Sequence, residues 1–493
     1  MSAKNRGLNL RSFWESATAP AHATFEAIEN EEDGIDLDAL ARVLPHYVGA
    51  GPRYTSYPTV PNWEQSFREL DHATALESRD HTSDLSLYVH VPFCKSLCHF
   101  CACNRVITQD PAVPERYLRA IDTELDTIRE HLNGPLTANQ LHWGGGTPTH
   151  LNPSQLERLF RSTSDRFPLA PGAEISIEVD PRVTTADQIA VLADCGFNRI
   201  SLGVQDTNPK TQEAIHRIQP FELTRDLTEL ARASGIDRVN FDLIYGLPHQ
   251  TTCSFERTLD AVISAEPDRI ALYGYAHVSW LAKQQRGFER FDLPTPALRV
   301  RIQLLAIRRL LEAGYRFIGM DHFAKPEDEI CRALDSGTLR RNFMGYTTLD
   351  GVDVIACGPS GISDLATSYI QSEKGLPAWF EAVEAGRLAT ARGHRLSLDD
   401  EARRWIIGRI MCQGHVSARE CEIEFGGCFR EDYARSLARL EMLEHDGLVE
   451  LSATGGFRVT SIGRLFLRNV AMAFDAYLDT NQLGIAKQFS QTV

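Results

Sequence analysis

Four cysteines stand close together in this chain: Cys94, Cys98 and Cys101 with the spacing C-x3-C-x2-C, and Cys103 two residues later. Three thiolates in one loop can hold three irons of a 4Fe–4S cluster and leave the fourth iron open to a substrate or cofactor. Cys103 is then surplus, and we expect it to lie near the cluster without binding iron. The spacing therefore indicates electron transfer into a bound molecule.

Other uses of these cysteines fit the sequence less well. A structural zinc site usually spreads two pairs of ligands over a longer interval. Disulfides are not expected, because the other seven cysteines are scattered singly and no secretory signal precedes them. His90 precedes the cysteine loop and His99 lies inside it, and we expect both to be hydrogen-bonding neighbours rather than ligands.

The length and composition bound the class of protein. A chain of 493 residues suggests about two to four domains. The formal net charge of −15 argues against nucleic-acid binding, which requires a basic face. No apolar run approaches the roughly 20 residues that span a bilayer, and the N-terminus lacks the apolar core of a signal peptide. We therefore expect a cytoplasmic protein with no membrane contact.

Strands alternate with amphipathic helices after the first fifth of the chain. The expected strands are Leu85–Val91, Gln140–Trp143, Glu174–Val179, Arg199–Gly203, Arg238–Tyr245 and Arg269–Tyr275. The expected helices are Glu115–Leu132, Pro153–Arg166, Ala186–Asp194, Glu222–Ser234 and Ser254–Ala265. This pattern predicts an α/β fold in which six or so βα units form a parallel sheet, curled into a partial or full barrel.

Residues with chemical potential gather at the ends of these strands. The cysteine loop follows the first strand, and the glycine run Gly144–Pro148 follows the second. Glu178 stands at the end of the third strand, Gln205 follows the fourth, and Asp242 lies within the fifth. In barrels of parallel strands the reactive groups lie at the carboxyl ends of the strands, so we expect these features on one rim.

The glycine run and the carboxylates each allow two interpretations. Glycines let a backbone come close to a ligand, but an ordinary turn would also explain them. Alternation places Glu178 and Asp180 on the same side of their strand. Asp242 is embedded among apolar residues and needs a partner, either a salt bridge within the barrel or a hydroxyl or ammonium group of a small polar cofactor.

We divide the chain into four regions. Residues 1–50 form an N-terminal arm, whose first 35 residues include the acidic run Glu29–Asp33. Residues 51–320 form the catalytic barrel, with GPRYTSYPT (Gly51–Thr59) as a non-helical lead-in. Residues 321–395, with the Gly-rich stretches RNFMGYTT and CGPSGIS, form an irregular region that completes the barrel and connects it onward.

Residues 396–493 form a mainly helical domain with a hairpin at Gly447–Thr460, which resembles a winged helix. A winged helix can bind DNA, but residues Asp399–Thr460 carry about as many acidic as basic side chains. We therefore expect this domain to cover the active site and not to bind DNA.

The cysteine spacing after a first strand resembles that of the radical S-adenosylmethionine (SAM) superfamily. From about residue 45 onward, the chain resembles within it the bacterial oxygen-independent coproporphyrinogen III oxidase family. The segments that carry this resemblance are GPRYTSYPT, SLYVHVPFCKSLCHFCACN, LHWGGGTPT, EISIEVDPR, GVQD, DLIYGLP, GMDHFAKP and RNFMGYTT. The haem-chaperone branch usually lacks the fourth cysteine and tends to lack the lead-in.

The resemblance implies a role for each matching position. Cys94, Cys98 and Cys101 would ligate the cluster, and one SAM would lie near Tyr88, Gly145, Glu178 and Ile362. A second SAM would lie near Phe100, Gly146, Thr147, Gln205, Arg217, Asp242 and Ala276. The catalytic positions would be Tyr88, Glu178, Phe343 and Ile362.

The implied reaction is the oxidative decarboxylation of two propionates of coproporphyrinogen III to vinyl groups, which gives protoporphyrinogen IX. A 5′-deoxyadenosyl radical, made from SAM by a reduced cluster, would remove hydrogen from the propionate β-carbon. The implied partners are this tetracarboxylate tetrapyrrole and a flavodoxin-like or ferredoxin-like electron donor, and the protein is expected to be a monomer.

The substrate carboxylates call for local cations, and Arg53, Arg340 and Arg341 are the candidates, although Arg53 could equally hold the N-terminal arm. Met344, Gly274 and Ala102 depart from the glutamine, asparagine and glycine that the family leads us to expect. Two alternatives stay open: a haem-binding chaperone of the same family, and another radical SAM reaction on a tetrapyrrole.

Overall fold

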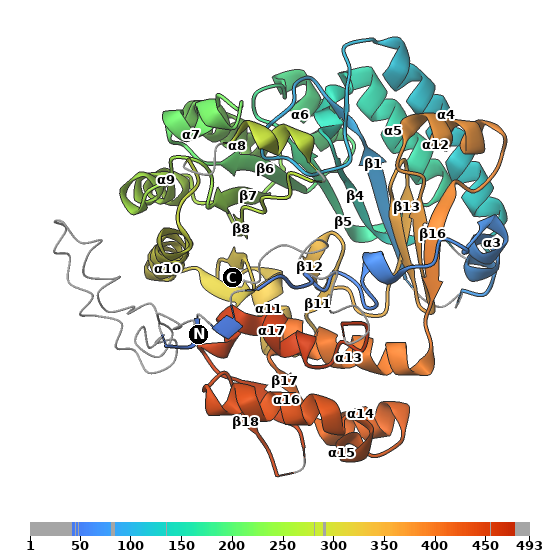
Figure 1. The fold of residues 1–493 in the computed structure, drawn as a ribbon. Helices are drawn as coiled ribbons and strands as arrows, with labels where there is room; N and C mark the ends of the chain where they lie inside the picture. The colour runs from blue at the N-terminus through green and yellow to red at the C-terminus, as the bar shows by residue number, and fades with distance from the viewer. Residues whose placement is uncertain are drawn as a thin grey trace, which may run out of the picture.

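A computed structural model describes residues 42–44, 46–47, 49–79, 84–134, 136–280, 282–288, 292–453 and 455–478. The predicted flexible arm of residues 1–35, with its acidic run, lies outside this part. Figure 1 shows a strongly curled sheet with helices on its outer side and C-terminal helices across its open side.

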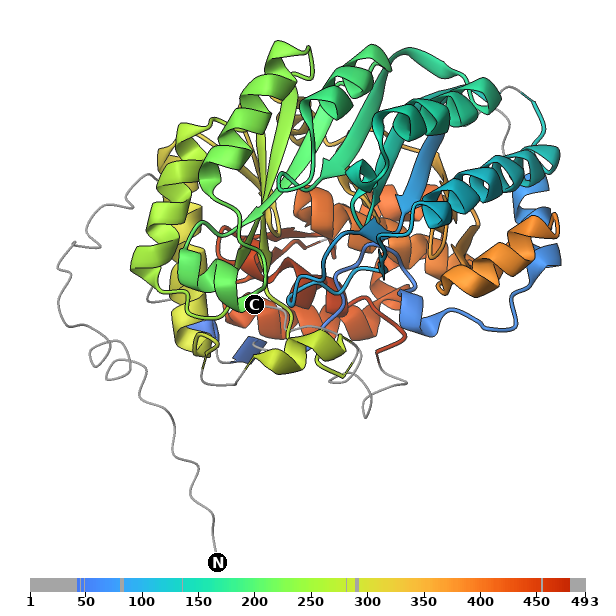
Figure 2. The same cartoon turned by 90° about the horizontal axis from the view of Figure 1, so that it is seen from above.

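Six predicted strands pair in parallel in chain order and form the centre of the sheet. They are β1 (Leu85–Val91), β4 (Ala138–Gly145), β5 (Leu169–Val179), β6 (Arg199–Gln205), β7 (Arg238–Tyr245) and β8 (Arg269–Gly274). The helices that follow them on the outside are α4 (Ala112–Glu130), α5 (Pro153–Arg166), α6 (Ala186–Asp194), α7 (Pro209–Ala214), α8 (Phe221–Ala233) and α9 (Thr252–Ser264) (Figures 1 and 2). The predicted α/β partial barrel is confirmed.

Strands such as β1 and β5 alternate between apolar and polar side chains, and this alternation sets the core. Leu87 and Val89 of β1 and Ile175 and Ile177 of β5 are buried in the main hydrophobic cluster with the helices. The residues between them, such as Ser176, face the inside of the curl and carry polar groups. The hydrophobic core therefore lies between sheet and helices, and the inner face is left for chemistry.

Local signals explain where several helices begin. Asn152, Thr185 and Thr251 each precede a helix and accept a hydrogen bond from the backbone N–H three residues later. The third residue of each helix returns a side-chain bond to the backbone of the capping residue. These capping boxes satisfy N–H groups that a helix start would otherwise leave without partners.

The sheet extends beyond the predicted strands to twelve in all. On one side β13 (Asp353–Cys357) pairs in parallel with β1, and β14 (Ile362–Leu365), β15 (Ser368–Ser372) and β16 (Thr390–Arg395) follow in antiparallel order. On the other side β10 (His322–Ala324) and β9 (Arg316–Gly319) add to β8. Its two edges, β16 and β9, do not pair with each other, so the curl is open on one side.

A hairpin and a long helix span this open side (Figure 1). The hairpin consists of β11 (Arg340–Asn342) and β12 (Gly345–Thr347), and the helix is α13 (Leu398–Gln413). The hydroxyl of Tyr346 donates to the carbonyl of Met411 in α13, at 2.9 Å. Arg404 of α13 pairs with Asp364 of β14 at 2.8 Å. The helix thus holds both the hairpin and one side of the sheet.

The interpretation of residues 321–395 as irregular was wrong in part. RNFMGYTT forms the β11–β12 hairpin with Phe343 and Met344 at its tip, and CGPSGIS connects β13 to β14. The glycines that suggested a loop instead occupy tight connections. Gly345 and Gly358 have φ values of 124° and 91°, a backbone conformation that favours glycine.

The C-terminal region contains the predicted hairpin of β18 (Val449–Leu451) and β19 (Phe457–Val459). With β17 (His415–Val416) it makes a three-stranded sheet in the order β17-β19-β18, beside α14 (Ala418–Phe425), α15 (Phe429–Asp432) and α16 (Ala434–His445). This order of elements is that of a winged helix. Figure 1 shows it on the side of α13 away from the main sheet, so α13 and α17 (Leu467–Met472) are the parts that face the barrel.

The lead-in and the C-terminal segment hold each other. Arg468 of α17 donates to the carbonyls of Gly51 and Pro52, the latter at 2.9 Å. The hydroxyl of Tyr54 donates to Asp475 at 2.9 Å. In the part of the chain that the structure covers, no helix has the length and apolar character needed to cross a membrane.

Glu124 of α4 makes the stability of the protein depend on pH. Its carboxyl accepts from the N–H of Gly358 at 2.6 Å and from Nε1 of Trp379 at 3.0 Å. Burial raises its pKa to about 7. Because the folded state holds this proton more tightly than the unfolded state, the stabilisation is complete below the unfolded pKa of about 4.3 and is lost as the pH rises through 7.

We predict that Glu124→Gln will flatten the decrease in the free energy of unfolding between pH 5 and pH 8, measured anaerobically by urea titration. Glu130→Gln, an exposed change in the same helix, is the control and should keep the wild-type decrease. Equal pH dependence in Glu124→Gln and wild type would contradict the assignment.

Candidate active site

The amino-terminal half of the inner face is closed by a belt of hydrogen bonds. Ser86 donates to Gln140 at 2.6 Å, and Gln140 donates to Glu174 at 2.8 Å. Arg199 continues the belt by pairing with Glu174 at 3.3 Å. These pairings offset part of the cost of burying the polar groups inside the curl, while Nε and Nη1 of Arg199 have no hydrogen-bond partner among the described residues.

Glu178 lies beyond this belt, nearer the carboxyl ends of the strands. Its carboxylate accepts from the N–H of Gly145 at 3.1 Å and contacts Nε2 of His142 at 3.4 Å. The position inside the barrel raises the pKa of Glu178, but His142 and Gly145 outweigh this effect and hold it below its usual value. The side chain is 46% exposed, so an ionised carboxylate faces the inside of the barrel.

Tyr88 and the neighbouring imidazoles support this carboxylate. The ring of Tyr88 stacks on His142 with centroids 5.8 Å apart. Nδ1 of His142 accepts from Ser176 at 2.6 Å, which leaves Nε2–H to face Glu178. The hydroxyl of Tyr88 donates to His90 at 3.0 Å, and His90 donates to the carbonyl of Asn104 at 2.9 Å. His90 is therefore the hydrogen-bonding neighbour that we expected.

Asp242 has neutral partners. Ser201 donates to one of its carboxyl oxygens at 3.1 Å, and Asn240 donates to the other at 3.0 Å. Burial, with the charge of Glu178 as a second cause, raises the pKa of Asp242 to about 7. Among the described residues it forms no salt bridge, so the structural alternative of an ion pair within the barrel is not found. The carboxyl is left half-buried on the inner face.

The glycine run packs directly against the cysteine loop. The N–H of Gly146 donates to Val91 at 2.9 Å, and that of Thr147 donates to Phe93 at 2.8 Å. A Cβ on Gly146 would lie 2.5 Å from the carbonyl oxygen of Pro92. The protein's own backbone therefore demands glycine here, and cofactor contact by Gly145 and Gly146 stays a prediction.

The three cysteines of the predicted cluster have different surroundings. Cys94 lies 3.6 Å from the hydroxyl of Thr147, and burial raises its pKa to about 11. Cys98 accepts from Arg182 at 3.4 Å and from Arg217 at 3.6 Å. The thiol of Cys103 lowers the pKa of Cys101 to about 6.

This donor set suits a cluster better than a single ion. No group of three or more His, Cys, Asp or Glu side chains in the described ranges could hold one metal ion, so the thiols do not form a closed tetrahedral site. Two guanidinium groups, those of Arg182 and Arg217, donate N–H groups to the sulfur of Cys98. Three separated thiols in one loop fit a 4Fe–4S cluster with an open iron.

Arg217 joins the cysteine loop to the strand ends. Besides Cys98, it donates to Asp180 at 3.2 Å and to the carbonyl of Gly203 at 2.8 Å. Burial raises the pKa of Asp180, but Arg217 and Arg182 outweigh it and hold that pKa low. Asp180 thus accepts hydrogen bonds from Arg182 and Arg217, while Glu178 accepts from the glycine run. The two carboxylates therefore do not share a partner.

Other predicted cofactor positions lie around the same end of the barrel. Gln205 closes β6 at a bulge with φ 65°, and its amide lies against Gly203. Gln285 donates to the carbonyls of both Phe100 and Ala276, at 2.8 and 3.1 Å, and so brings these two segments together.

Phe343 and Ile362 belong to a separate apolar cluster around Trp63 and Tyr369. The ring of Phe343 lies 5.9 Å from Trp63 and 6.3 Å from Tyr369. Met344 follows at the hairpin tip, where its N–H donates to Asn342 at 2.9 Å. These contacts place Phe343 and Ile362 in an apolar wall, and their catalytic role stays a prediction.

Sequence reasoning missed several polar residues of the inner face: His142, Ser201, Asn240, Tyr273, Arg182 and His322. A search for polar residues at every second position of apolar strands, such as Gln140 and His142, would have found some of them. Arg182 carried no such signal, because it lies just after its strand.

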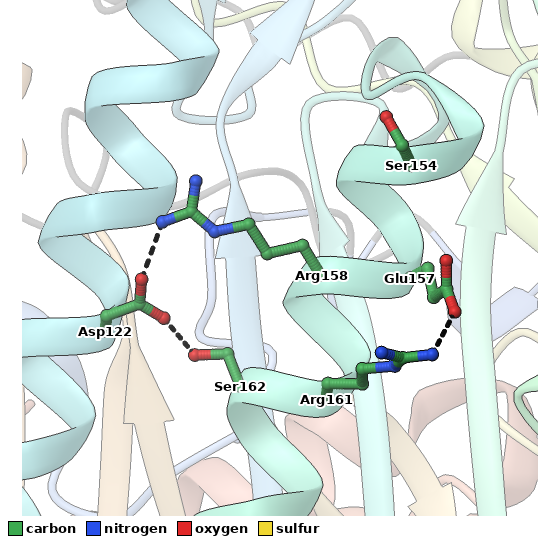
Figure 3. Close-up of a pocket in the computed structure, with 6 residues that line it drawn as sticks. All are labelled: Asp122, Ser154, Glu157, Arg158, Arg161 and Ser162. Atoms are coloured by element: carbon green, nitrogen blue, oxygen red, sulfur yellow. Dashed lines mark hydrogen bonds and ion pairs between the residues drawn. The ribbon is translucent and has the colours of Figure 1, made fainter.

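A surface hollow lies elsewhere, between α4 and α5 (Figure 3). It is lined by Asp122, Ser154, Glu157, Arg158, Arg161 and Ser162. These side chains pair with one another, as Arg158 does with Asp122 at 2.7 Å. The hollow is on the outer helical layer and is separate from the strand ends that carry the cysteine loop.

A partial barrel with a three-cysteine loop after its first strand defines a radical SAM enzyme, and the profile of the radical SAM superfamily matches residues 88–262. Oxygen-independent coproporphyrinogen III oxidase from Pseudomonas aeruginosa is 41% identical over 441 residues, which cover 89% of this chain and 96% of the relative. The Escherichia coli K12 protein of the same name is 40% identical over 459 residues, which cover 93% and 99%.

The solved structure of coproporphyrinogen III oxidase from Escherichia coli superposes with a TM-score of 0.84 at 41% identity, over 86% of this chain and 98% of that one. The chain therefore belongs to the oxygen-independent coproporphyrinogen III oxidase family. Membership implies a 4Fe–4S cluster and SAM as cofactors.

We predict that Gly146→Ala will displace the cysteine loop, because the new Cβ meets the backbone of Pro92. The variant should lose most of its iron after reconstitution and be destabilised by on the order of 1–3 kcal/mol. Gly408→Ala, a helical position with no atom within 4 Å of the new Cβ, is the control and should keep its iron. Equal iron content in the two variants would contradict the prediction.

Proposed function

We propose that this protein decarboxylates two propionates of coproporphyrinogen III to vinyl groups without oxygen and so makes protoporphyrinogen IX. The observation that carries the proposal is a loop of three cysteines beside an ionised carboxylate, Glu178, near the carboxyl ends of neighbouring parallel strands. Relatives with this activity in their names cover almost the whole chain.

Cys94, Cys98 and Cys101 would hold the cluster, and Cys103 would stay outside it. When bound, the reduced cluster and SAM supply a carbon radical that removes hydrogen from the β-carbon of a propionate, after which loss of CO2 and one electron leaves the vinyl group. Arg182 and Arg217, which donate N–H groups to Cys98, would lie beside the cluster.

The residues of the inner face position the SAM. We assign the first SAM to the surroundings of Tyr88, Gly145, Glu178 and Ile362. The ionised carboxylate of Glu178 suits the ammonium or hydroxyl groups of that cofactor. The belt below it and the apolar wall of Phe343 and Ile362 exclude water from the reacting carbons.

A second SAM would lie near Phe100, Gly146, Thr147, Gln205, Arg217, Asp242 and Ala276. Asp242 supports this assignment, because its neutral partners leave an inner-face carboxyl that a cationic ligand could ionise.

The expected partners follow from charge and compartment. We propose a flavodoxin-like or ferredoxin-like protein as electron donor, and a monomeric enzyme in the cytoplasm that binds neither nucleic acid nor membrane. The net charge of −15 supports the first exclusion, and a reducing compartment suits eleven free cysteines.

One observation favours a second candidate, a haem-binding chaperone of the same family. Met344 stands at the hairpin tip where we expect glutamine, and a thioether is only a weak hydrogen-bond acceptor. A chaperone would bind haem stoichiometrically and transfer it without turnover.

An anaerobic assay with reconstituted enzyme, reductant, SAM and coproporphyrinogen III tests the function. We predict vinyl products and deoxyadenosine from the wild type, and neither above background from Cys94→Ala, which loses one cluster ligand. Cys103→Ala is the matched control and should keep its iron and its deoxyadenosine yield. No vinyl product from a reducible wild-type enzyme would reject the function, and an active Cys94→Ala would reject the ligand assignment.

A binding measurement tests the second SAM. Asp242→Asn keeps a hydrogen bond with Ser201 but cannot ionise, so we predict that it binds one SAM where the wild type binds two, by equilibrium dialysis with labelled SAM. Asp237→Asn, an exposed change just before β7, should bind as the wild type does. A wild type that saturates with a single SAM would contradict the assignment.

A further inference from the structure

Two arginines and a histidine gather around one aspartate beside β8 and β10. We call Arg53, Asp321, His322 and Arg341 the cationic corner. His322 of β10 pairs in register with Ala271 of β8, which pairs with Asp242 of β7. His322 is therefore on the inner face of the sheet, level with Asp242.

The corner is built around Asp321. Arg53 pairs with one carboxylate oxygen at 2.5 Å, and Nδ1–H of His322 donates to the other at 2.6 Å. The guanidinium of Arg53 lies over the ring of Tyr273, 5.4 Å from its centroid. The ring of His322 meets Tyr273 edge-on at 5.9 Å. Both oxygens of Asp321 are thus already engaged.

Arg341 of β11 completes the corner without a carboxylate partner among the described residues. It donates to the backbone carbonyl of Arg53 at 2.7 Å and lies over Tyr346, 5.5 Å from the ring centroid. Its Nε has no hydrogen-bond partner in the same part of the chain. Tyr346 in turn meets His322 edge-on at 5.2 Å.

The corner carries more positive than negative charge. Burial raises the pKa of Asp321, but His322, Arg53 and Arg341 hold it well below its usual range. Burial lowers the pKa of Arg468 to about 9, and the charge of the nearby Arg53 contributes to this decrease. The guanidinium groups of Arg53 and Arg341 thus face one carboxylate, and a half-buried excess of this kind is relieved by a bound anion.

Tyr273 connects the corner to the proposed cofactor positions. After burial, the charges that raise its pKa are those of Asp242, Asp321 and Glu178, while Arg53 lowers it. The phenol of Tyr273 therefore lies within electrostatic reach of the carboxyl groups of Glu178 and Asp242 and also of the cationic corner. A ligand that extends from the cofactor side of the barrel would meet the corner next.

We propose that the cationic corner binds a carboxylate of the substrate, on a propionate that is not being decarboxylated, and that Arg341 is the principal anchor. This assignment rests on the proposed function. A guanidinium presents two parallel N–H groups that match a carboxylate, and Arg341 is the member of the corner not already paired with Asp321. Its role is to position the substrate.

The neighbouring residue provides a matched comparison. Arg340 precedes Arg341 on the same strand, and alternation turns it to the opposite face. Its guanidinium pairs with Asp350 at 2.5 Å near the surface. Of the two arginines that the sequence offered equally, the structure therefore assigns substrate binding to Arg341 alone.

The test measures binding of oxidised coproporphyrin III, an unreactive tetracarboxylate, to the holoenzyme by fluorescence titration. Loss of a charge-assisted hydrogen bond should weaken binding by Arg341→Gln about 10- to 100-fold. Arg340→Gln should bind within about twofold of the wild type. The tetramethyl ester of the porphyrin, which has no carboxylates, should not distinguish the two variants.

Two further readouts separate the explanations. Arg341→Gln should keep its iron content and bind SAM as the wild type does, by equilibrium dialysis with labelled SAM, because the cysteines and the proposed SAM positions are untouched. If that variant does not fold, Arg341→Lys is compared with Arg340→Lys. We expect Arg341→Lys to bind the porphyrin about threefold more weakly, because lysine lacks the paired donors of arginine. Equal porphyrin binding by the glutamine variants, or by the lysine pair in its place, would overturn the assignment.

The proposed function can fail independently. A wild type that makes no vinyl product would reject decarboxylation, while the titration would still report whether Arg341 binds a tetrapyrrole carboxylate.

Discussion

The organising constraint of this molecule is that its sheet turns polar side chains inward, where they need polar partners. An ordinary barrel packs its interior with apolar residues, but here Ser86, Gln140, Glu174 and Arg199 form a continuous hydrogen-bonded belt. The apolar core is displaced to the layer between sheet and helices. Stability and chemistry are therefore assigned to opposite faces of the same strands, and polar residues can be arranged for ligands without hollowing the core.

The mouth of the barrel divides its charges between two sides. Glu178 and Asp242, on β5 and β7, present carboxyl groups that suit a cofactor with a sulfonium and an ammonium group. The cationic corner beside β10 and β11 presents the opposite sign to a substrate rich in carboxylates. The β11–β12 hairpin links these sides, because its base contributes Arg341 and its tip contributes Phe343. With the assignments proposed above, opposite charges would keep cofactor and substrate in distinct places within the same space.

The sequence predicted those parts of the fold that depend on local pattern. The bounds of β1, β7, α5 and α6 agree to the residue, since strict alternation or a capping box marks each. The pairing of Leu85 with Asp353 could not be foreseen, because it joins segments far apart in the chain. Arg340 and Arg341 were equally plausible from the sequence, and only the register of the hairpin separates them. The cysteine spacing identified the candidate site, but the partners of the cysteines come from other strands.

The clasp between the lead-in and α17 has a consequence for biosynthesis. Arg468 donates to the carbonyl of Pro52, a residue that leaves the ribosome 416 positions earlier. At ordinary elongation rates that interval is on the order of tens of seconds. Throughout it the lead-in lacks this contact with α17, while the segment with Cys94 and the barrel strands are already made. The growing chain thus passes through a stage in which the barrel strands exist without this clasp, and synthesis of α17 ends that stage.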